Sequence, residues 1–370
     1  MNDNPGLLLT VFAFLLVLGP LVFVHEMGHY LVGRWFGVKA DSFSLGFGRE
    51  IAGWTDKRGT RWKLGMLPLG GYVQFAGDMD PSSRADPNWM ALPAEERNRT
   101  FQSKTLWQRA LIVFAGPAIN FLFAILILAG FAFAYGKSVT PPVVAGVLPN
   151  SAAAEAGLLP GDRIVSVDGE RIEWFDELGR RIAHRPDERI TLRAERAGQV
   201  REFDFRIGVE VQKDRFGNEY RIGRLGIMSS KPVMRPVSLA EAPIVAVERT
   251  GDIVRLMVAT LGQVITGRRS VSELGGPLKI AQVSGEQLSA GLDDFIFFIA
   301  LISINLGFIN LLPIPMLDGG HLLFYAIEGI RRKPVNPKVM EWAFRSGLAA
   351  VLALMVFVTV NDLASFGLLG

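Results

Sequence analysis

Two histidines and a glutamate stand together near the start of the chain, directly after a long apolar run. The segment HEMGH places His25 and His29 four residues apart, with Glu26 between them. On a helix, residues four apart share a face, so both imidazoles can reach one tetrahedral metal ion. Glu26 would then stand beside the metal-bound water and could take its proton. The spacing therefore predicts a metal site able to activate water.

Two histidines leave a zinc ion short of a protein ligand, and a second polar motif offers one. The run INLLPIPMLDGGH, residues 309–321, contains Asp318, the only carboxylate between Asp294 and Glu328. A carboxylate oxygen fits the third zinc position and leaves the fourth open for water. His321, three residues on, is a rival ligand or a hydrogen-bond partner of a ligand. The fourth histidine, His184, is expected on the surface.

A simpler interpretation is that His25 and His29 only form hydrogen bonds within a helix bundle. The eighteen apolar residues before them, Leu7–Val24, argue against it. Ionisable groups at the end of such a run cost several kcal/mol unless they are paired or ligated, and intramembrane ionisable residues are functional by default. The metal site is the stronger hypothesis.

The elements that position these residues are apolar spans. Four runs approach or exceed the ~20 residues that cross a bilayer: 7–24, 111–135, 295–312, and 348–360 with its flanks. Hydrophobic residues make up 49% of the chain and charged residues 20%. A fifth run, 242–266, holds four charges and is predicted to be an amphipathic surface helix instead. The expected fold is a polytopic α-helical membrane protein with about four transmembrane helices.

Charge placement sets the expected orientation. Lysine and arginine gather between the first and second spans and again at 331–338, so these loops are predicted to be cytoplasmic and both termini outside. The first four residues lack Lys and Arg, which favours a retained transmembrane helix over a signal peptide. With no cysteine, disulfides and Cys-type metal sites are excluded. A net charge of +3 without a basic patch gives no indication of nucleic acid.

Two further segments interrupt the helices. The exported stretch contains AGLLPGDRIVSVDGERI, residues 156–172, which is similar to PDZ domains; the likeness covers roughly 141–229. It predicts one inserted PDZ-like α+β domain with an Asp168–Gly169 turn. The loop 41–76 predicts three or four short strands with a turn at Asp56–Gly59. These strands are expected to be membrane-associated, the alternative being an ordinary cytoplasmic hairpin.

The two motifs together resemble the site-2 protease family of intramembrane metalloproteases. The likeness rests on HExxH in the first membrane helix and N-x-x-P-x-P-x-L-D-G-G in a later one. It is closest to the bacterial regulator-of-sigma-E protease branch, which 43–48 (FSLGFG) and 99–121 also resemble. The resemblance implies His25, His29 and Asp318 as ligands of Zn²⁺, Glu26 as the catalytic residue and Asn310 as a substrate-binding residue. Better-known members carry two tandem PDZ domains, whereas this chain shows one signature.

The expected function is cleavage of single-span membrane proteins in the bacterial inner membrane. Substrates would be an anti-sigma factor already trimmed by an upstream site-1 protease, or signal-peptide remnants. A helical substrate must unwind before cleavage, and a strand edge can pair with its freed backbone. The edge is predicted at Phe43, Ser44, Leu45, Gly46, Phe47 and Gly48, with Asn310 opposite.

Alternative functions are a metal transporter and a non-catalytic scaffold that binds membrane helices. Transporters usually show internal repeats, which this sequence lacks, and Glu26 is needed only for hydrolysis. The PDZ-like domain either binds a substrate C-terminus or excludes substrates with large exported domains, and the resemblance favours exclusion.

The predicted division of the chain has seven parts. They are a first transmembrane helix (1–36), a β-rich loop (37–104), a second transmembrane helix (105–136), the periplasmic PDZ-like domain (137–230), periplasmic amphipathic helices (231–292), a third transmembrane helix with the LDG motif (293–330) and a fourth (331–370).

Overall fold

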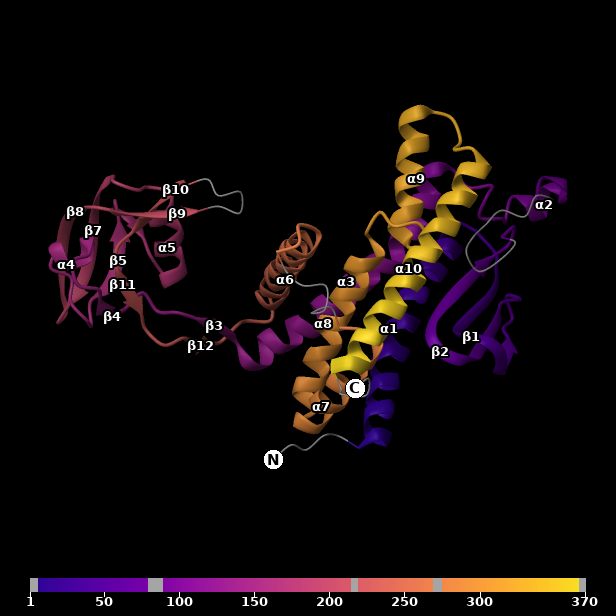
Figure 1. Cartoon of the computed structure of the whole chain (residues 1–370), viewed down its shortest axis with the longest axis horizontal. Helices are drawn as coiled ribbons and strands as arrows, with labels where there is room; N and C mark the ends of the chain where they lie inside the picture. Colours follow the sequence, from indigo (N-terminus) through magenta and orange to yellow (C-terminus); the bar gives the residue numbers. More distant parts are fainter. Residues whose placement is uncertain (1–5, 79–88, 214–218, 269–274, 366–370) are drawn as a thin grey trace. The chain divides into compact units, whose positions relative to one another are not determined.

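The chain forms two compact units, which are described separately. The computed structural model describes residues 6–78, 89–213, 219–268 and 275–365. One unit joins Met1–Gly130 to Ala240–Gly370, and the other is Phe131–Leu239. Figure 1 shows the elements of both units in sequence colours. The predicted inserted domain is therefore a separate compact unit.

Four helices in the described part of the chain are long and apolar enough to cross a membrane. They are α1 (Leu7–Trp35), α3 (Leu106–Tyr135), α8 (Leu292–Asn310) and α10 (Pro337–Ser365, of which Lys338–Ala364 qualifies). Each contains or overlaps one of the predicted apolar spans. The charged run forms α6 (Ala242–Ile265), which is not among these four, as predicted.

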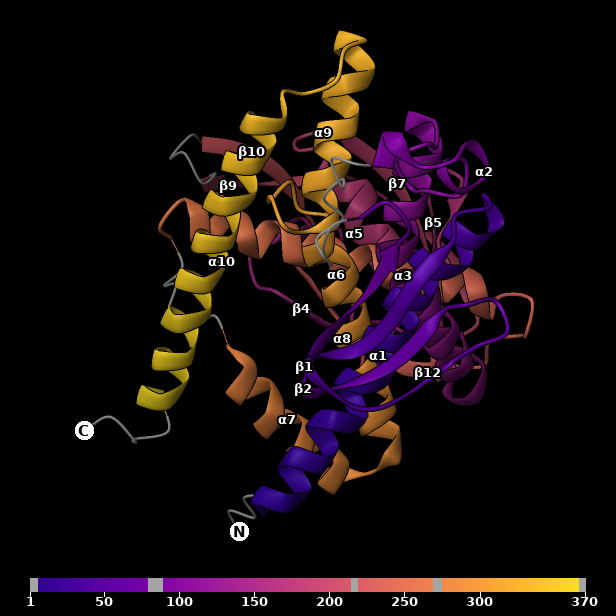
Figure 2. The ribbon, with the colours of Figure 1, turned by 90° about the vertical axis from the view of Figure 1, so that its right-hand side faces the viewer.

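Two of the three apolar clusters in the described part of the first unit join α1, α3 and α8. In one, α1 packs through Ala13, Val17 and Leu21 against Phe295 of α8, with α7 (Pro277–Ala290) alongside. In the other, Ala124 and Leu128 of α3 meet α6 and α8. Figures 1 and 2 show α1, α7 and α8 side by side. These contacts fix α1, α3 and α8 relative to one another, which the candidate site requires.

A single β-sheet covers one side of α1 (Figure 2). It consists of β1 (Ala40–Thr55) and β2 (Arg61–Phe75), joined by the predicted turn, in which the Gly59 N–H donates to the Asp56 carbonyl. Three or four short strands were predicted, but two long, bent ones are found. Glycines at the bends adopt positive φ, as Gly46 (87°) and Gly70 (114°) show, so one strand continues in a new direction where the sequence suggests a break.

The bends fold the sheet so that part of β1 has neighbours on both sides. Ser42 pairs with Gln74 on one side and with Arg61 on the other, and Leu45 pairs with Gly71 and with Leu64. One outer segment is therefore the end of β2, residues 71–75, and the other is the second half of β1, which pairs with residues 61–64. Several large apolar side chains of the sheet are exposed: Phe47, Ile51, Trp54, Leu64, Met66 and Leu67. The sheet therefore presents an apolar surface of the kind that binds a partner or a membrane.

The predicted third transmembrane segment, 293–330, contains two helices rather than one. After α8 ends at Asn310, the chain turns through residues 311–317, and α9 (Asp318–Arg331) begins. Pro313 and Pro315 lack the backbone N–H that a continuous helix needs, and Met316 has a positive φ of 85°. The break places Asp318 at the start of α9.

The second unit is a small α+β domain with its own core. Its four-stranded sheet has the order β6-β5-β7-β8: β5 (Arg163–Val167), β6 (Glu170–Arg171), β7 (Arg189–Arg196) and β8 (Gln199–Arg206). Two helices belong to it, α4 (Ala152–Glu155) and α5 (Phe175–Ala183). Paired short strands complete it: β4 (Val144–Val147) with β11 (Ile227–Ser229), β9 (Gly208–Lys213) with β10 (Glu219–Arg224), and β3 (Lys137–Val139) with β12 (Val233–Arg235). The predicted turn at Asp168–Gly169 connects β5 and β6.

Candidate active site

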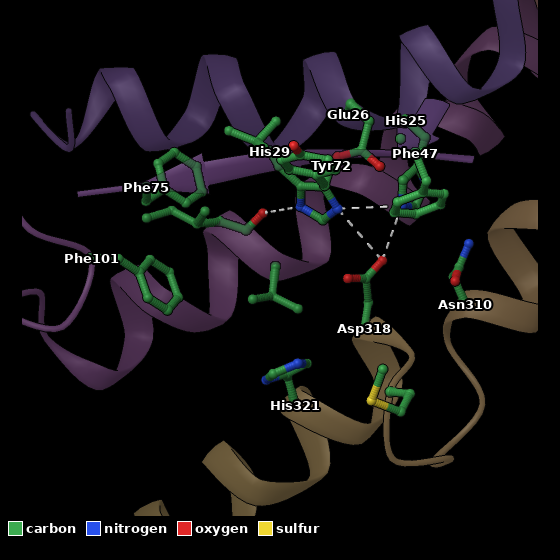
Figure 3. Close-up of a pocket in the computed structure, with 15 residues that line it drawn as sticks. His25, Glu26, His29, Phe47, Tyr72, Phe75, Phe101, Asn310, Asp318 and His321 are labelled. Carbon is green, nitrogen blue, oxygen red and sulfur yellow. Dashed lines mark hydrogen bonds and ion pairs between the residues drawn. The ribbon is translucent and has the colours of Figure 1, made fainter. Parts of the chain in front are cut away.

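A cavity of about 330 Å³ lies where α1, α3, β2, α8 and α9 meet. Figure 3 shows it from one side, with α1 above and the start of α9 below. Its polar lining is His25, Glu26, His29, Tyr72, Asn310, Asp318 and His321. All of these residues belong to the first unit, so the cavity lies within one compact unit.

Helix α1 supplies three of these side chains. The Nε2 atoms of His25 and His29 lie 3.3 Å apart, so the two imidazoles present their tips to the same point. Glu26 lies beside them, and both His25 and Glu26 are 8% exposed. The four-residue spacing thus does what helix geometry predicts: it brings both rings to one side, next to the carboxylate.

The third side chain comes from the start of α9. Asp318 Oδ2 lies 3.2 Å from His25 Nε2 and 3.6 Å from His29 Nε2. The turn that delivers Asp318 is tightly packed: a Cβ at position 319 would lie 2.2 Å from the Leu312 carbonyl oxygen, and one at 320 would lie 2.4 Å from that of Ile314. Only glycine fits at both positions, which explains the GG after Asp318.

Helix α3 closes the site from another side and contacts both imidazoles. His29 Nδ1 lies 2.9 Å from the backbone oxygen of Ile112. Because a carbonyl only accepts, the Nδ1 of His29 must carry the proton, which leaves its Nε2 lone pair directed at the shared point. One turn further along, Gly116 lies against both rings, and a Cβ there would be 2.2 Å from His29 Nε2.

One more turn along α3, Asn120 reaches His25. Its fully buried side-chain amide places Nδ2 3.1 Å from His25 Nδ1. Its backbone oxygen accepts a hydrogen bond of 2.8 Å from Ser303 Oγ of α8, and Ser303 is also fully buried. Ile112, Gly116 and Asn120 are spaced by four residues, so one stripe of α3 faces the paired histidines.

The arrangement fits a metal ion. One ligand atom from each of His25, His29 and Asp318 lies within 4.8 Å of the others, the only such group among the described residues. Asp318 Oδ2 is buried and forms no hydrogen bond with any described residue, although it faces two imidazole nitrogens. Three lone-pair atoms directed at one buried point repel each other unless a cation lies between them. Two imidazoles and one carboxylate suit zinc and leave a fourth position open.

The outer segment of β2 forms the wall beside Glu26. The Val73 backbone lies next to the Glu26 carboxylate. A Cβ at Gly71 would lie 3.0 Å from Glu26 Cγ and 2.7 Å from the Ser44 carbonyl oxygen, so the absence of a side chain lets β2 approach α1. The strand backbone thereby runs along the cavity next to the glutamate.

The predicted substrate-binding residues are not all at the cavity. Asn310, the last residue of α8, lines it, and Figure 3 shows Asn310 and His321 on opposite sides of Asp318. Of the predicted edge residues 43–48, only Phe47 lines it. Phe43, Ser44 and Leu45 are all paired on both sides within the sheet, the first two buried and Leu45 half-buried, so the predicted edge is wrong for them. The segment that faces the site is Gly71–Phe75.

The remaining histidines, His184 and His321, are not part of the cluster of His25, His29 and Asp318. His321 lines the cavity, but it is not one of the three clustered side chains. Its ring packs against Phe344, with the two ring centroids 4.8 Å apart. His184 is exposed at the end of α5 in the second unit, as predicted.

Sequence reasoning did not single out Ile112, Gly116 or Asn120. None of them is titratable, and Ile112 acts through its backbone. The available signal was Asn120 itself, because an amide inside an apolar span is costly unless it has a partner. Asn120 is four residues from Gly116, so helix periodicity predicts that both lie on one face of the helix.

Comparison with known proteins agrees with this geometry. The family model described as Peptidase family M50 matches residues 13–354. A protein of Agrobacterium fabrum, whose name describes a zinc metalloprotease, is 45% identical over 357 residues, 95% of each chain. The metalloprotease MmpA of Caulobacter vibrioides is 35% identical over 383 residues, 97% of this chain and 96% of that protein.

Among solved structures, a PDZ domain of an SdrC-like protein from Listeria monocytogenes matches 24% of this chain and 84% of its own, with 19% identity and a TM-score of 0.18. The family match spans most of the chain, including both motifs that line the cavity. The chain therefore belongs to peptidase family M50, the site-2 protease family, and is a membrane zinc metalloprotease.

Proposed function

We propose that this protein hydrolyses peptide bonds within the transmembrane segments of single-span membrane proteins, at zinc held by His25, His29 and Asp318. The observation that carries the proposal is that His25 and His29 lie on a membrane-length helix, with Asp318 within 3.6 Å of both imidazoles. His25 lies eighteen residues after Leu7 on α1, about 27 Å along the helix axis at ~1.5 Å per residue. The hydrocarbon core is ~30 Å thick, so the site lies near one end of the apolar layer.

In this mechanism Glu26 moves the proton. Bound zinc supplies an acidified water and polarises the scissile carbonyl. Glu26, buried beside the imidazoles, accepts one proton from the attacking water and later delivers it to the departing amine. The neighbouring Val73 backbone is placed to orient the carboxylate for both steps. The carbonyl carbon gains a hydroxyl and the C–N bond breaks, so the products are a carboxylic acid and an amine.

A transmembrane substrate has to unwind before it can enter this cavity. In lipid each freed N–H and C=O group must find a partner. We place the substrate as an added strand along Gly71–Phe75, the outer segment of β2, in line with Glu26. Phe47 and Tyr72, stacked with ring centroids 6.0 Å apart, lie at the wall, and Asn310 is available to the substrate backbone from the end of α8.

The catalytic proposal is tested with purified protein and a synthetic transmembrane peptide. We expect cleavage within the apolar stretch, loss of cleavage after zinc is removed by a chelator, and recovery when zinc is restored. Glu26→Gln should retain zinc and lose cleavage by ~10²–10⁴-fold, the usual contribution of a general base. A Glu26→Gln protein that still cleaves at the wild-type rate would contradict the role assigned to Glu26. Absence of cleavage by the zinc-loaded wild-type protein would instead favour a transporter or a scaffold.

Strand addition has its own test. In a β-ladder only every second residue of an added strand directs its N–H to its neighbour. Two peptides N-methylated at alternate positions around the cleavage site, in complementary sets, should therefore differ: one is cleaved and the other is not. Equal cleavage of both peptides would mean that the substrate does not bind as a strand.

We further propose that the protein acts in regulated intramembrane proteolysis in a bacterial inner membrane, with both termini and the inserted domain on the periplasmic side. Lysines and arginines in the loops between the first two and the last two spans support this orientation. Anti-sigma factors trimmed by an upstream site-1 protease, or remnants of signal peptides, are substrates of suitable size. The inserted domain is proposed to act as a filter that excludes substrates with large exported domains.

A further inference from the structure

Asn120 is a buried polar residue in an apolar helix, and the hydrolytic mechanism does not use it. Its side-chain amide is fully buried and lies 3.1 Å from Nδ1 of His25. Its Oδ1 atom is buried and forms no hydrogen bond with any of the described residues. An amide with one end on a ligand imidazole and the other end unpaired is costly in an apolar interior, so it calls for a functional explanation.

The chemistry of the imidazole supplies one. If His25 binds a metal through Nε2, its ring must be neutral with the proton on Nδ1. That N–H needs an acceptor, whereas the NH₂ end of an amide can only donate. The oxygen and nitrogen of an asparagine amide occupy nearly equivalent positions, so their assignment is fixed by the hydrogen-bond network. In the metal-bound protein Oδ1 must face His25.

Resting on the proposed ligand role of His25, we propose that Asn120 is the positioning residue of this ligand. Its Oδ1 accepts the Nδ1–H of His25, fixes the tautomer and aims Nε2 at the point shared with His29 and Asp318. The same helix does this for His29 through the Ile112 carbonyl, 2.9 Å from Nδ1. Helix α3 therefore contacts the Nδ1 atom of both histidine ligands, on the side of each ring away from the metal, although it contributes no ligand itself.

The backbone of Asn120 is also fixed. Ser303 of α8 donates to its carbonyl at 2.8 Å, and α8 ends at Asn310, just before the turn that leads to Asp318. The residue is therefore placed by a contact that is independent of the imidazole. This separation provides a matched control, since Ser303→Ala removes the backbone contact and leaves the amide in place.

The test measures zinc affinity in detergent by competition with a chromogenic chelator. Asn120→Leu keeps approximate volume but has no acceptor, and we expect its zinc dissociation constant to rise ~10–100-fold, as for other hydrogen-bond partners of metal-bound histidines. Asn120→Asp keeps an oxygen acceptor and should stay within a few-fold of wild type, as should Ser303→Ala. Equal losses in Asn120→Leu and Ser303→Ala, or an unchanged Asn120→Leu, would overturn the proposal.

A second measurement uses the unaltered protein, so it does not depend on how a variant folds. Zinc-loaded protein labelled with ¹⁵N-histidine should show a slowly exchanging proton on Nδ1 of His25 in nuclear magnetic resonance spectra. Detection of the proton on Nε2 instead would refute the proposed hydrogen bond. Failure of wild-type protein to bind zinc would refute the proposed function, whereas zinc binding insensitive to Asn120→Leu would refute only this inference.

Discussion

Gly116→Ala is expected to weaken zinc binding although it replaces neither a proposed ligand nor Glu26. The added Cβ would lie 2.2 Å from His29 Nε2 and 2.9 Å from His25 Cε1. Ordinary contacts begin at 3.4 Å, so the His29 ring would have to retreat by about 1.2 Å. Zinc–ligand distances tolerate deviations of only ~0.2 Å. We expect zinc affinity to fall at least ~10²-fold, with cleavage lost in proportion.

The control lies on the same helix. Gly130→Ala adds the same methyl group where no atom lies within 4 Å, so it should leave zinc content and cleavage unchanged. Zinc content is measured by mass spectrometry after dialysis against a weak chelator, and helical content by circular dichroism shows whether each variant is folded. A folded Gly116→Ala protein that binds stoichiometric zinc and cleaves at the wild-type rate would refute the packing argument.

Two further predictions concern the inserted unit, Phe131–Leu239. Burial raises the pKa of Asp162, but hydrogen bonds from Arg196 and the Leu159 backbone outweigh it, so the folded pKa lies below the usual value. This pair should stabilise the unit above the unfolded pKa of ~3.9 and stop doing so as the pH falls through the folded pKa. Arg196→Met should destabilise the unit near neutral pH, seen as a lower urea midpoint for proteolysis of the unit, with less effect in acid. Deleting residues 141–229 should allow cleavage of substrates with large exported domains if the unit is a filter; loss of all cleavage would indicate docking instead.

Much of the site could be predicted because its chemistry and its local geometry coincide. His25 and His29 are four residues apart on a helix whose apolar length is visible in the sequence, so their shared face follows from helix periodicity. Asp318 follows from its isolation as a carboxylate and from the prolines before it. Its approach to the imidazoles depends on close backbone packing around Gly319, which no periodicity reports.

The sheet was harder to predict, for a physical reason. Alternation and glycines mark residues 41–76 as β-structure, but they do not tell whether a glycine ends a strand or bends it. Gly46 and Gly70 bend their strands, which puts Phe43 between two neighbours and leaves Gly71–Phe75 on the outside. Whether a segment lies at the edge depends on how the sheet folds. The edge was therefore predicted at 43–48, whereas the neighbouring segment, Gly71–Phe75, is the one at the edge.

The three proposed zinc ligands come from two helices, but their geometry depends on a third. Helix α1 fixes the spacing of the imidazoles, and the turn before α9 delivers the carboxylate. Neither determines how the rings rotate about their side-chain bonds. That rotation is set by α3, through the Ile112 carbonyl on His29, the Asn120 amide on His25 and the space left by Gly116. Changes on α3 should therefore alter metal affinity first and the cleavage rate of the zinc-loaded protein less, whereas Glu26→Gln should do the reverse.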